Sequence, residues 1–250
     1  LHHIPALSNV LYSEDILFPI ADFYLKKERW NEAIEVYEEM ETIGALQGRG
    51  AEYYQKLGYA LQKNKKYAEA IDAYLKADTL KPDNIWNNRH LAICYRLNRN
   101  YQAALSYYKK VEEATPEDTN VIFHIGSCLA ELGQYEEAAN YFFKLDFIES
   151  NCIKAWRGIG WCSFISRKYE QAMKYYEKII EQKPLAIDYM NAGHVAWTMG
   201  DIQKAAALYG KSITANGNRE RFLEMFRKDK EALLKQGIQE EDIPLMLDLL

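Results

Sequence analysis

The sequence predicts an all-α protein built from tandem helical pairs, and three observations lead to this fold class. Ala is followed four residues later by Tyr or Phe, and these pairs recur at intervals of 37, 34, 34, 34 and 33 residues. Apolar residues elsewhere step by three and four, the period of amphipathic helices. No segment alternates apolar and polar residues as a half-buried strand would. The pairs are Ala33/Tyr37, Ala70/Tyr74, Ala104/Tyr108, Ala138/Phe142, Ala172/Tyr176 and Ala205/Tyr209.

An apolar residue followed by a small one precedes each of these pairs by 11 to 13 positions. A small side chain at this point lets two helices approach closely, where a larger one would force them apart. Pro82, Pro116 and Pro184 close three of the units, because Pro ends one helix before the next begins. The apolar and small residues are Ile20/Ala21, Leu57/Gly58, Leu91/Ala92, Ile125/Gly126, Ile159/Gly160 and Ala192/Gly193.

This pattern resembles the tetratricopeptide repeat family, whose 34-residue unit reads W-x2-L-G-x2-Y, then A-x3-F, then P. One matching unit contains Tyr54, Leu57, Gly58, Leu61, Ala70, Tyr74, Ala77 and Pro82, and another contains Trp156, Ile159, Gly160, Ala172, Tyr176, Ile179 and Pro184. We place six units at 14–47, 51–84, 85–118, 119–152, 153–185 and 186–219, after a lead at 1–13. The resemblance implies a right-handed α-α superhelix, a solenoid with a concave inner wall.

The physics of packing supports the same architecture. A lone helical pair cannot bury its apolar face, so successive units must stack on one another. Short links that contain Asn or Gly, at 63–65, 98–100 and 132–134, are expected to turn the chain within a unit.

Three irregularities interrupt the pattern. Extra residues at 47–50 predict a longer connection between the first two units, and Pro19 predicts a first helix that kinks or starts late. Residues 220–250 are expected to form C-terminal capping helices, because a repeat array needs a polar helix at its open end. Within them, Gly237 breaks the pattern, and the acidic residues 240–242 precede a final Leu-rich helix.

Composition excludes several classes of protein. The net charge of −5 and the pI of about 5.7 oppose binding to nucleic acid or to an anionic membrane, since both need a basic surface. No apolar run is long enough to span a bilayer, so we expect no membrane insertion. The sequence contains no GxSxG, HExxH or phosphate-binding loop. We therefore predict no enzymatic activity, no catalytic residues and no cofactor.

The cysteines and histidines are expected to be structural. Cys94, Cys128 and Cys162 lie 34 residues apart at equivalent positions, which predicts buried, inert thiols. Neighbouring units lie about 10 Å apart, whereas a disulfide needs Cα atoms within about 7 Å. His90 and His124 also lie 34 apart, but no further ligands converge on them, so no metal site is predicted.

The resemblance places ligands in the concave groove, on the second, fifth, ninth and twelfth positions of each unit. Acidic residues occupy these positions in the N-terminal third, and basic and aromatic residues occupy them further on. Arg and Trp are enriched at binding hot spots because they combine a large contact area with directed hydrogen bonds. The candidate groove residues are Tyr59, Trp86, Arg89, Arg96, Phe123, Lys154, Arg157, Trp161, Phe164, His194 and Trp197.

The prediction is thus a non-enzymatic protein- or peptide-binding scaffold that holds an extended partner segment in the groove. The partner is expected to mix carboxylates with aromatic or aliphatic anchors. The Lys and Asn set of the family's carboxylate clamp is absent, which argues against binding of chaperone C-termini. The alternative is a structural or self-assembling segment of a larger protein, joined through 240–250, with the groove filled intramolecularly. A third option, nucleic-acid binding by the Arg and aromatic residues, is opposed by the acidic balance.

The compartment stays open. Free thiols and the lack of an Asn-x-Ser/Thr site slightly favour the cytoplasm, and a leader before Leu1 would not be visible in this sequence. The compact, regular units are typical of a bacterial protein.

Overall fold

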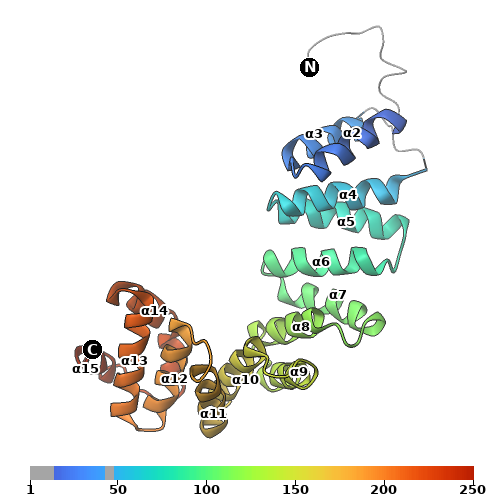
Figure 1. Ribbon diagram of the computed structural model, residues 1–250. Coiled ribbons are helices and arrows are strands. Elements are labelled where there is room, and N and C mark those ends of the chain that lie inside the picture. Colours follow the sequence, from blue (N-terminus) through green and yellow to red (C-terminus); the bar gives the residue numbers. More distant parts are fainter. Residues whose placement is uncertain (1–13, 43–47) are drawn as a thin grey trace. The chain divides into compact units, whose positions relative to one another are not determined.

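The computed structural model of the protein describes residues 14–42 and 48–250, and every regular element within them is a helix (Figure 1). The predicted all-α class is therefore confirmed for the described part of the chain. The predicted lead at 1–13 lies outside it. The helices divide between two compact units, one that ends at Pro116 and one that begins at Glu117.

The first unit consists of helical pairs that pack in chain order. Each helix contacts the next one in the sequence, both within a pair and between pairs. The links within a pair are so short that its two helices run in opposite directions. The pairs are α2 (Glu14–Lys26) with α3 (Trp30–Thr42), α4 (Gly50–Lys63) with α5 (Tyr67–Leu80), and α6 (Ile85–Leu97) with α7 (Tyr101–Ala114).

The second unit repeats this arrangement and adds two helices. As with α4 and α6 in the first unit, the first helices of successive pairs touch directly, and α10 lies against both α8 and α12. The pairs are α8 (Thr119–Glu131) with α9 (Tyr135–Ile148), α10 (Ile153–Ile165) with α11 (Tyr169–Ile180), and α12 (Ala186–Thr198) with α13 (Ile202–Asn216). The additional helices are α14 (Arg219–Lys235) and α15 (Asp242–Asp248).

One residue in the left-handed region ends the first helix of every described pair. After α4, for example, Lys65 has φ 62°, and the N–H of Lys66 donates to the carbonyl of Leu61 at 2.9 Å. This geometry satisfies carbonyls that the helix end would otherwise leave without a partner. The predicted turns at 63–65, 98–100 and 132–134 all contain such a residue. The set is Glu28, Lys65, Arg99, Gly133, Arg167 and Gly200.

The recurring aromatic residue packs against the small residue of its own pair. A Cβ atom built on Gly58 would lie 2.8 Å from the ring of Tyr74, and one on Gly126 would lie 2.9 Å from Phe142. Such distances are shorter than van der Waals contact, so the two helices can approach this closely only with glycine there. The expected role of the small residues is confirmed at both positions.

The first helix differs from the expectation of a late start. α2 begins at Glu14 and continues through Pro19. Because Pro19 lies near the N-terminal end of the helix, its missing N–H removes only one early hydrogen bond. The longer connection predicted at 47–50 begins outside the described residues, and its described part, Gly48 and Arg49, forms a turn directly before α4.

The two additional helices close the second unit. Asn218 caps α14 by accepting a hydrogen bond from the N–H of Arg221, and Gly237 follows the helix with φ 100°. α14 packs on α13 and on α12. Ile243 and Met246 anchor α15 through their buried side chains.

All four cysteines are free and buried. Burial raises the pKa of the Cys94 and Cys162 thiols to about 12. Neither thiol is ionised near neutral pH, and the thiolate is the reactive form. The prediction of buried, inert thiols at these positions agrees with the structure.

Candidate binding groove

The second unit contains a cavity of about 430 Å³ between the first helices of its pairs, which we name the main cavity. Its walls come from α8, α10 and α12, with one ring from α9. Four of the predicted groove residues, Phe123, Lys154, Arg157 and Trp161, meet here. The full lining is Phe123, Ser127, Ala130, Glu131, Phe142, Lys154, Arg157, Gly158, Trp161, Cys162, Ile187, Asp188 and Asn191.

Aromatic rings make one wall of the main cavity apolar. The rings of Phe123 and Phe142 lie 6.0 Å apart. Phe142 also passes over Gly158, where an added Cβ would lie 2.5 Å from the ring. The absence of a side chain at Gly158 therefore lets Phe142 reach the inner face of α10.

Arg157 is already paired within the protein. Its Nε and Nη2 atoms donate to the two carboxylate oxygens of Asp188, each at 2.7 Å. The Asp188 side chain is only 1% exposed, and it also accepts the N–H of Leu185 at 2.7 Å, which caps α12. The hydrogen bonds that Arg157 donates to Asp188 raise the pKa of the Arg157 guanidinium further. Arg157 lines the cavity as predicted, but its charge is neutralised there by Asp188, which the sequence analysis did not identify.

The charge of Lys154 is less completely paired than that of Arg157. Its Nζ lies 3.4 Å from a carboxylate oxygen of Glu149 and 5.7 Å from the centre of the Phe123 ring. The side chain is 37% exposed, and an exposed ion pair of this kind is weak. Lys154 is thus the cation of the main cavity that an incoming carboxylate can reach.

Three predicted groove residues are buried, and α14 covers two of them, His194 and Trp197. Phe164, His194 and Trp197 are 1%, 0% and 5% exposed. The ring of Phe226 lies 5.4 Å from that of His194 and 6.4 Å from that of Trp197. These three side chains therefore do not line an open groove, which corrects the expectation for them. For His194 and Trp197 the cause is the path of α14, which packs on α12. The ring of Phe164 lies 6.4 Å from that of His194.

The covered histidine is hydrogen-bonded through one ring nitrogen, and its other ring nitrogen faces a carboxylate of α14. His194 Nδ1 lies 2.8 Å from the hydroxyl of Tyr209, and Nε2 lies 3.4 Å from a carboxylate oxygen of Asp229. At the other end of α14, the amide of Gln236 donates to the carbonyl of Ile165 at 3.3 Å. α14 therefore spans from α12 to the end of α10.

A smaller cavity of about 260 Å³ lies between α10 and α14. It shares Trp161 with the main cavity, so this half-buried ring borders both spaces. Lys228 and Lys235 of α14 lie on its rim. The open part of the groove in this unit thus runs along α8 and α10 and meets α14 beside Trp161.

The remaining predicted residues belong to the first unit. Tyr59 and Trp86 lie 6.3 Å apart, and Trp86 is 43% exposed. His90 lies beneath them, 4.0 Å from the Trp86 ring, with Nδ1 2.8 Å from Gln62 Oε1. Arg89 is half-buried on the same helix. We name Tyr59, Trp86 and His90 the aromatic face.

Arg96 lies further along α6. Its Nε donates to the hydroxyl of Tyr108 at 3.4 Å, a long hydrogen bond. The structure therefore places the predicted groove residues in three settings: the main cavity, the surface beneath α14, and the inner side of the first unit.

His90 makes the stability of the first unit depend on pH. Burial, and then the charges of Lys63 and Arg89, lower the pKa of His90 to about 4, below its usual value of 6.5. As the pH falls, His90 is protonated in the unfolded chain before it is protonated in the folded protein. The contribution of neutral His90 to folding stability is therefore complete above pH 6.5 and is lost as the pH falls toward 4. Allowing for the partial exposure of the ring, we expect a loss of about 1–2 kcal/mol.

Thermal unfolding at pH 7 and at pH 5 measures this effect. The His90→Gln variant is expected to lose less stability over this interval than the parent. An equal loss in both proteins would assign the pH dependence to other groups.

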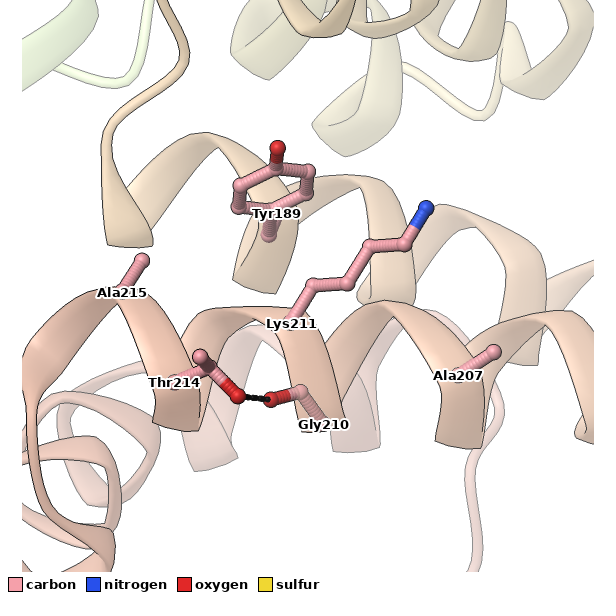
Figure 2. A pocket seen from close by; sticks show the side chains of 6 residues that line it. All are labelled: Tyr189, Ala207, Gly210, Lys211, Thr214 and Ala215. Atoms are coloured by element: carbon pink, nitrogen blue, oxygen red, sulfur yellow. Dashed lines mark hydrogen bonds between the residues drawn. The ribbon is translucent and has the colours of Figure 1, made fainter.

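A hollow of about 510 Å³ lies between α12 and α13, and Figure 2 shows its lining. Ala207, Gly210 and Thr214 form a row of small residues, and the Lys211 ammonium lies 6.0 Å from the ring of Tyr189. This hollow offers one ring and one cation. The main cavity offers several rings together with polar groups, so we place the candidate site there.

Within 14–42 and 48–250, His, Cys, Asp and Glu side chains do not gather in any group of three that could hold a metal ion. None of the described helices combines the length and the apolar character that crossing a membrane requires.

Comparison with known proteins gives one consistent family. Family models described as tetratricopeptide repeat match residues 17–47, 51–84, 96–162, 153–184 and 189–219, which together make up more than half of the chain. No curated protein matches the sequence.

Several solved structures share the fold. A tetratricopeptide repeat protein from Parabacteroides merdae is 19% identical, with 94% of this chain and 98% of that chain covered and a TM-score of 0.65. YrrB, described as a TPR protein with an unusual peptide-binding site, is 20% identical over 76% of this chain and 96% of its own, with a TM-score of 0.61. MamA from Desulfovibrio magneticus RS-1 is 18% identical over 67% and 93%, also with a TM-score of 0.61.

Proposed function

Because the chain belongs to the tetratricopeptide repeat family, we propose that it is a non-enzymatic scaffold whose main cavity holds an extended segment of a partner protein. One observation carries this proposal. Phe123, Lys154 and Trp161 come from successive first helices, α8 and α10, and line a single cavity. The volume of about 430 Å³ falls in the range of ligand-binding pockets, about 300–1,000 Å³.

The lining indicates the chemistry of the partner segment. Phe123, Trp161 and Ile187 offer apolar surface, so the segment needs an aromatic or aliphatic anchor. Lys154 favours a carboxylate near this anchor. Arg157 adds no free charge because Asp188 is already bound to it. The lining therefore favours a partner segment that makes mainly apolar contacts with the cavity and one charge-assisted hydrogen bond with Lys154.

The comparisons agree with this class of ligand. The solved structure of YrrB is described as having a peptide-binding site, and a peptide is the ligand proposed here. The proposal depends on the main cavity of this chain, since a likeness at 20% identity carries the fold alone.

A structural role is the second candidate. The observation that favours it is α14, which covers His194 and Trp197 and so fills part of the inner surface from within the chain. In this role the repeats position other parts of an assembly, and the main cavity stays empty.

Site-specific photo-crosslinking tests the binding proposal. A photoreactive phenylalanine replaces Phe123 or Trp161 in the cavity, and, as a control, Phe147, which is 89% exposed on α9 and outside the cavity. A partner that crosslinks from the cavity positions and not from position 147 supports the proposal. Equal crosslinking from all three positions contradicts it.

The affinity of the captured partner gives the quantitative test. We expect Trp161→Ala and Lys154→Glu each to weaken binding at least tenfold, because truncation at the centre of an interface removes about 2 kcal/mol or more. Lys211→Glu, in the hollow between α12 and α13, is the matched control and should bind like the parent. Arg157→Glu is unsuitable, since it would place a second carboxylate beside buried Asp188 and destabilise the fold.

A further inference from the structure

Two cavities follow one stripe of side chains along α10. Lys154, Gly158 and Trp161 line the main cavity, and Trp161 and Ile165 line the smaller cavity. Successive members of this stripe are four, three and four residues apart, so they share one face of the helix. The groove of the second unit therefore continues past Trp161, from the start of α10 to its end.

The Trp161 ring lies at the boundary between the two cavities. It is half-buried and lines both of them. Its centre lies 5.6 Å from that of the Phe164 ring, which is 1% exposed. Movement of this buried ring would open a space in a close-packed interior, so Phe164 supports Trp161 in its position. A bound segment can therefore contact the same fixed ring from both cavities.

α14 supplies one wall of the smaller cavity and is attached to the end of α10. The amide of Gln236 donates to the carbonyl of Ile165 at 3.3 Å, and Arg167 Nη2 donates to the carbonyl of Lys235 at 3.0 Å. The hydroxyl of Tyr169 donates to Gln236 Oε1 at 3.0 Å. These three hydrogen bonds hold α14 beside α10, so the smaller cavity is part of the folded unit.

The smaller cavity suits one apolar side chain. Tyr135, Trp161, Ile165 and Ala232 line it with rings and aliphatic groups. An apolar cavity of about 150 Å³ is already large enough to bind benzene, and this cavity has about 260 Å³. Its charged lining residues are two lysines and two acids, so the site favours neither sign of charge: Lys228, Lys235, Asp229 and Glu231.

We propose that the partner segment carries a second apolar anchor, which enters the smaller cavity while the first anchor occupies the main cavity. This inference rests on the proposed function, because it concerns the same bound segment, and it identifies the pattern that the segment needs. Lys154 and Ile165 lie at opposite ends of the stripe on α10. The carboxylate, the first anchor and the second anchor therefore follow one another in this order, and α14 is part of the binding site.

The helix sets the spacing of the two anchors. On α10 the lining runs from Lys154 to Cys162 in the main cavity and from Trp161 to Ile165 in the smaller one. The midpoints are about five residues apart, or about 8 Å along the helix. Side chains on the same side are about 7 Å apart at i and i+2 of a strand, and about 9 Å apart at i and i+3 of a polyproline II helix. We therefore expect one or two residues between the anchors.

Fluorescence polarisation with labelled synthetic peptides tests the inference on the full 250-residue chain. The probe is Asp-Leu-Ser-Ser-Leu, measured in both chain directions, together with versions that carry no Ser or one, three or four Ser between the leucines. The tightest binding is expected with one or two Ser. Replacement of the second Leu by Ser should weaken binding at least tenfold, because a buried apolar side chain is lost.

A variant that fills the smaller cavity gives the sharper result. Ala232→Leu adds a side chain from α14 and leaves the lining of the main cavity unchanged. It should bind the two-anchor peptide at least tenfold more weakly than the parent protein and the single-anchor peptide equally well, which also shows that it is folded. Glu224→Leu, at an exposed position of α14 that lines neither cavity, is the matched control and should bind both peptides like the parent.

Three results would overturn the inference. An affinity that depends on neither the second Leu nor its spacing would mean that one anchor suffices, and weaker binding of the same peptides to Trp161→Ala would then still support the proposed function. A preference for two anchors that survives Ala232→Leu would place the second anchor elsewhere. Failure of every peptide to bind would reject the pattern, whereas crosslinking of the natural partner from position 123 decides the proposed function separately.

Discussion

Replacement of Gly193 by Ala is expected to lower the free energy of unfolding of the second unit by about 2 kcal/mol. A Cβ there would lie 2.5 Å from the ring of Tyr209. That ring cannot yield easily, because it is fully buried and its hydroxyl is bonded to His194 Nδ1. Phe222 and Phe226 pack on it from the other side, at 5.6 Å and 5.7 Å.

Gly210 provides a matched control on the paired helix. A Cβ at this position meets nothing within 4 Å. Gly210→Ala should therefore raise stability by about 0.5–1 kcal/mol, since Ala favours the helix over Gly. Chemical denaturation of the two variants measures the difference. Equal stabilities would mean that Tyr209 relaxes and that the close approach of α12 and α13 is not required.

Phe226→Ala is expected to cost about 3–5 kcal/mol, the largest effect of any substitution proposed here. The side chain is 2% exposed and lies among the rings of His194, Trp197 and Tyr209. Its loss opens a space that these rings cannot close while α14 keeps its backbone path. We therefore expect α14 to separate from α12 before the rest of the unit unfolds.

Thermal unfolding and tryptophan fluorescence together follow this change. Separation of α14 exposes Trp197 to water and shifts its fluorescence emission to longer wavelength. We expect this shift at a temperature below the midpoint of the main unfolding transition. Arg227→Ala, at the neighbouring position, is the control. Arg227 is exposed, so its replacement removes no buried contact. A single cooperative transition without the early shift would show that α14 and the repeats unfold together.

The helical pairs could be predicted from the sequence because their signals are local. The Ala and aromatic residues, as at Ala172 and Tyr176, lie on one helix and repeat at a fixed period. The small residue that receives the ring, Gly160, belongs to the same pair. Contacts of this kind also occur at Gly58, Gly126 and Gly193, so the pattern carries both the elements and their packing.

The electrostatics of the candidate site could not be predicted in the same way. Arg157 and Asp188 lie 31 residues apart on successive first helices. Their pairing depends on where two side chains of different units meet, and it occurs once. The sequence does place an acidic residue, Asp188, at the third position of the unit that follows Arg157. This position indicates an ion pair only once α10 and α12 are known to pack side by side.

The covered residues illustrate a second limit. His194 and Trp197 occupy the ninth and twelfth positions of their unit, which the resemblance places in the groove. Whether that surface is open depends on the direction of α14 after Asn218. The spacing of Phe222, Phe226 and Leu233 predicts an amphipathic helix, but it does not say which neighbouring surface the helix covers.

The buried thiols allow local unfolding of the protein to be measured through their rate of chemical modification. Cys94 belongs to the first unit and Cys128 to the second, both side chains are fully buried, and an alkylating reagent reaches either one only when the surrounding helices separate. The rate of modification at each site therefore measures how often that unit opens under native conditions. Mass spectrometry can measure both rates in one sample, so the two units can be ranked by stability without introducing a new residue as a probe.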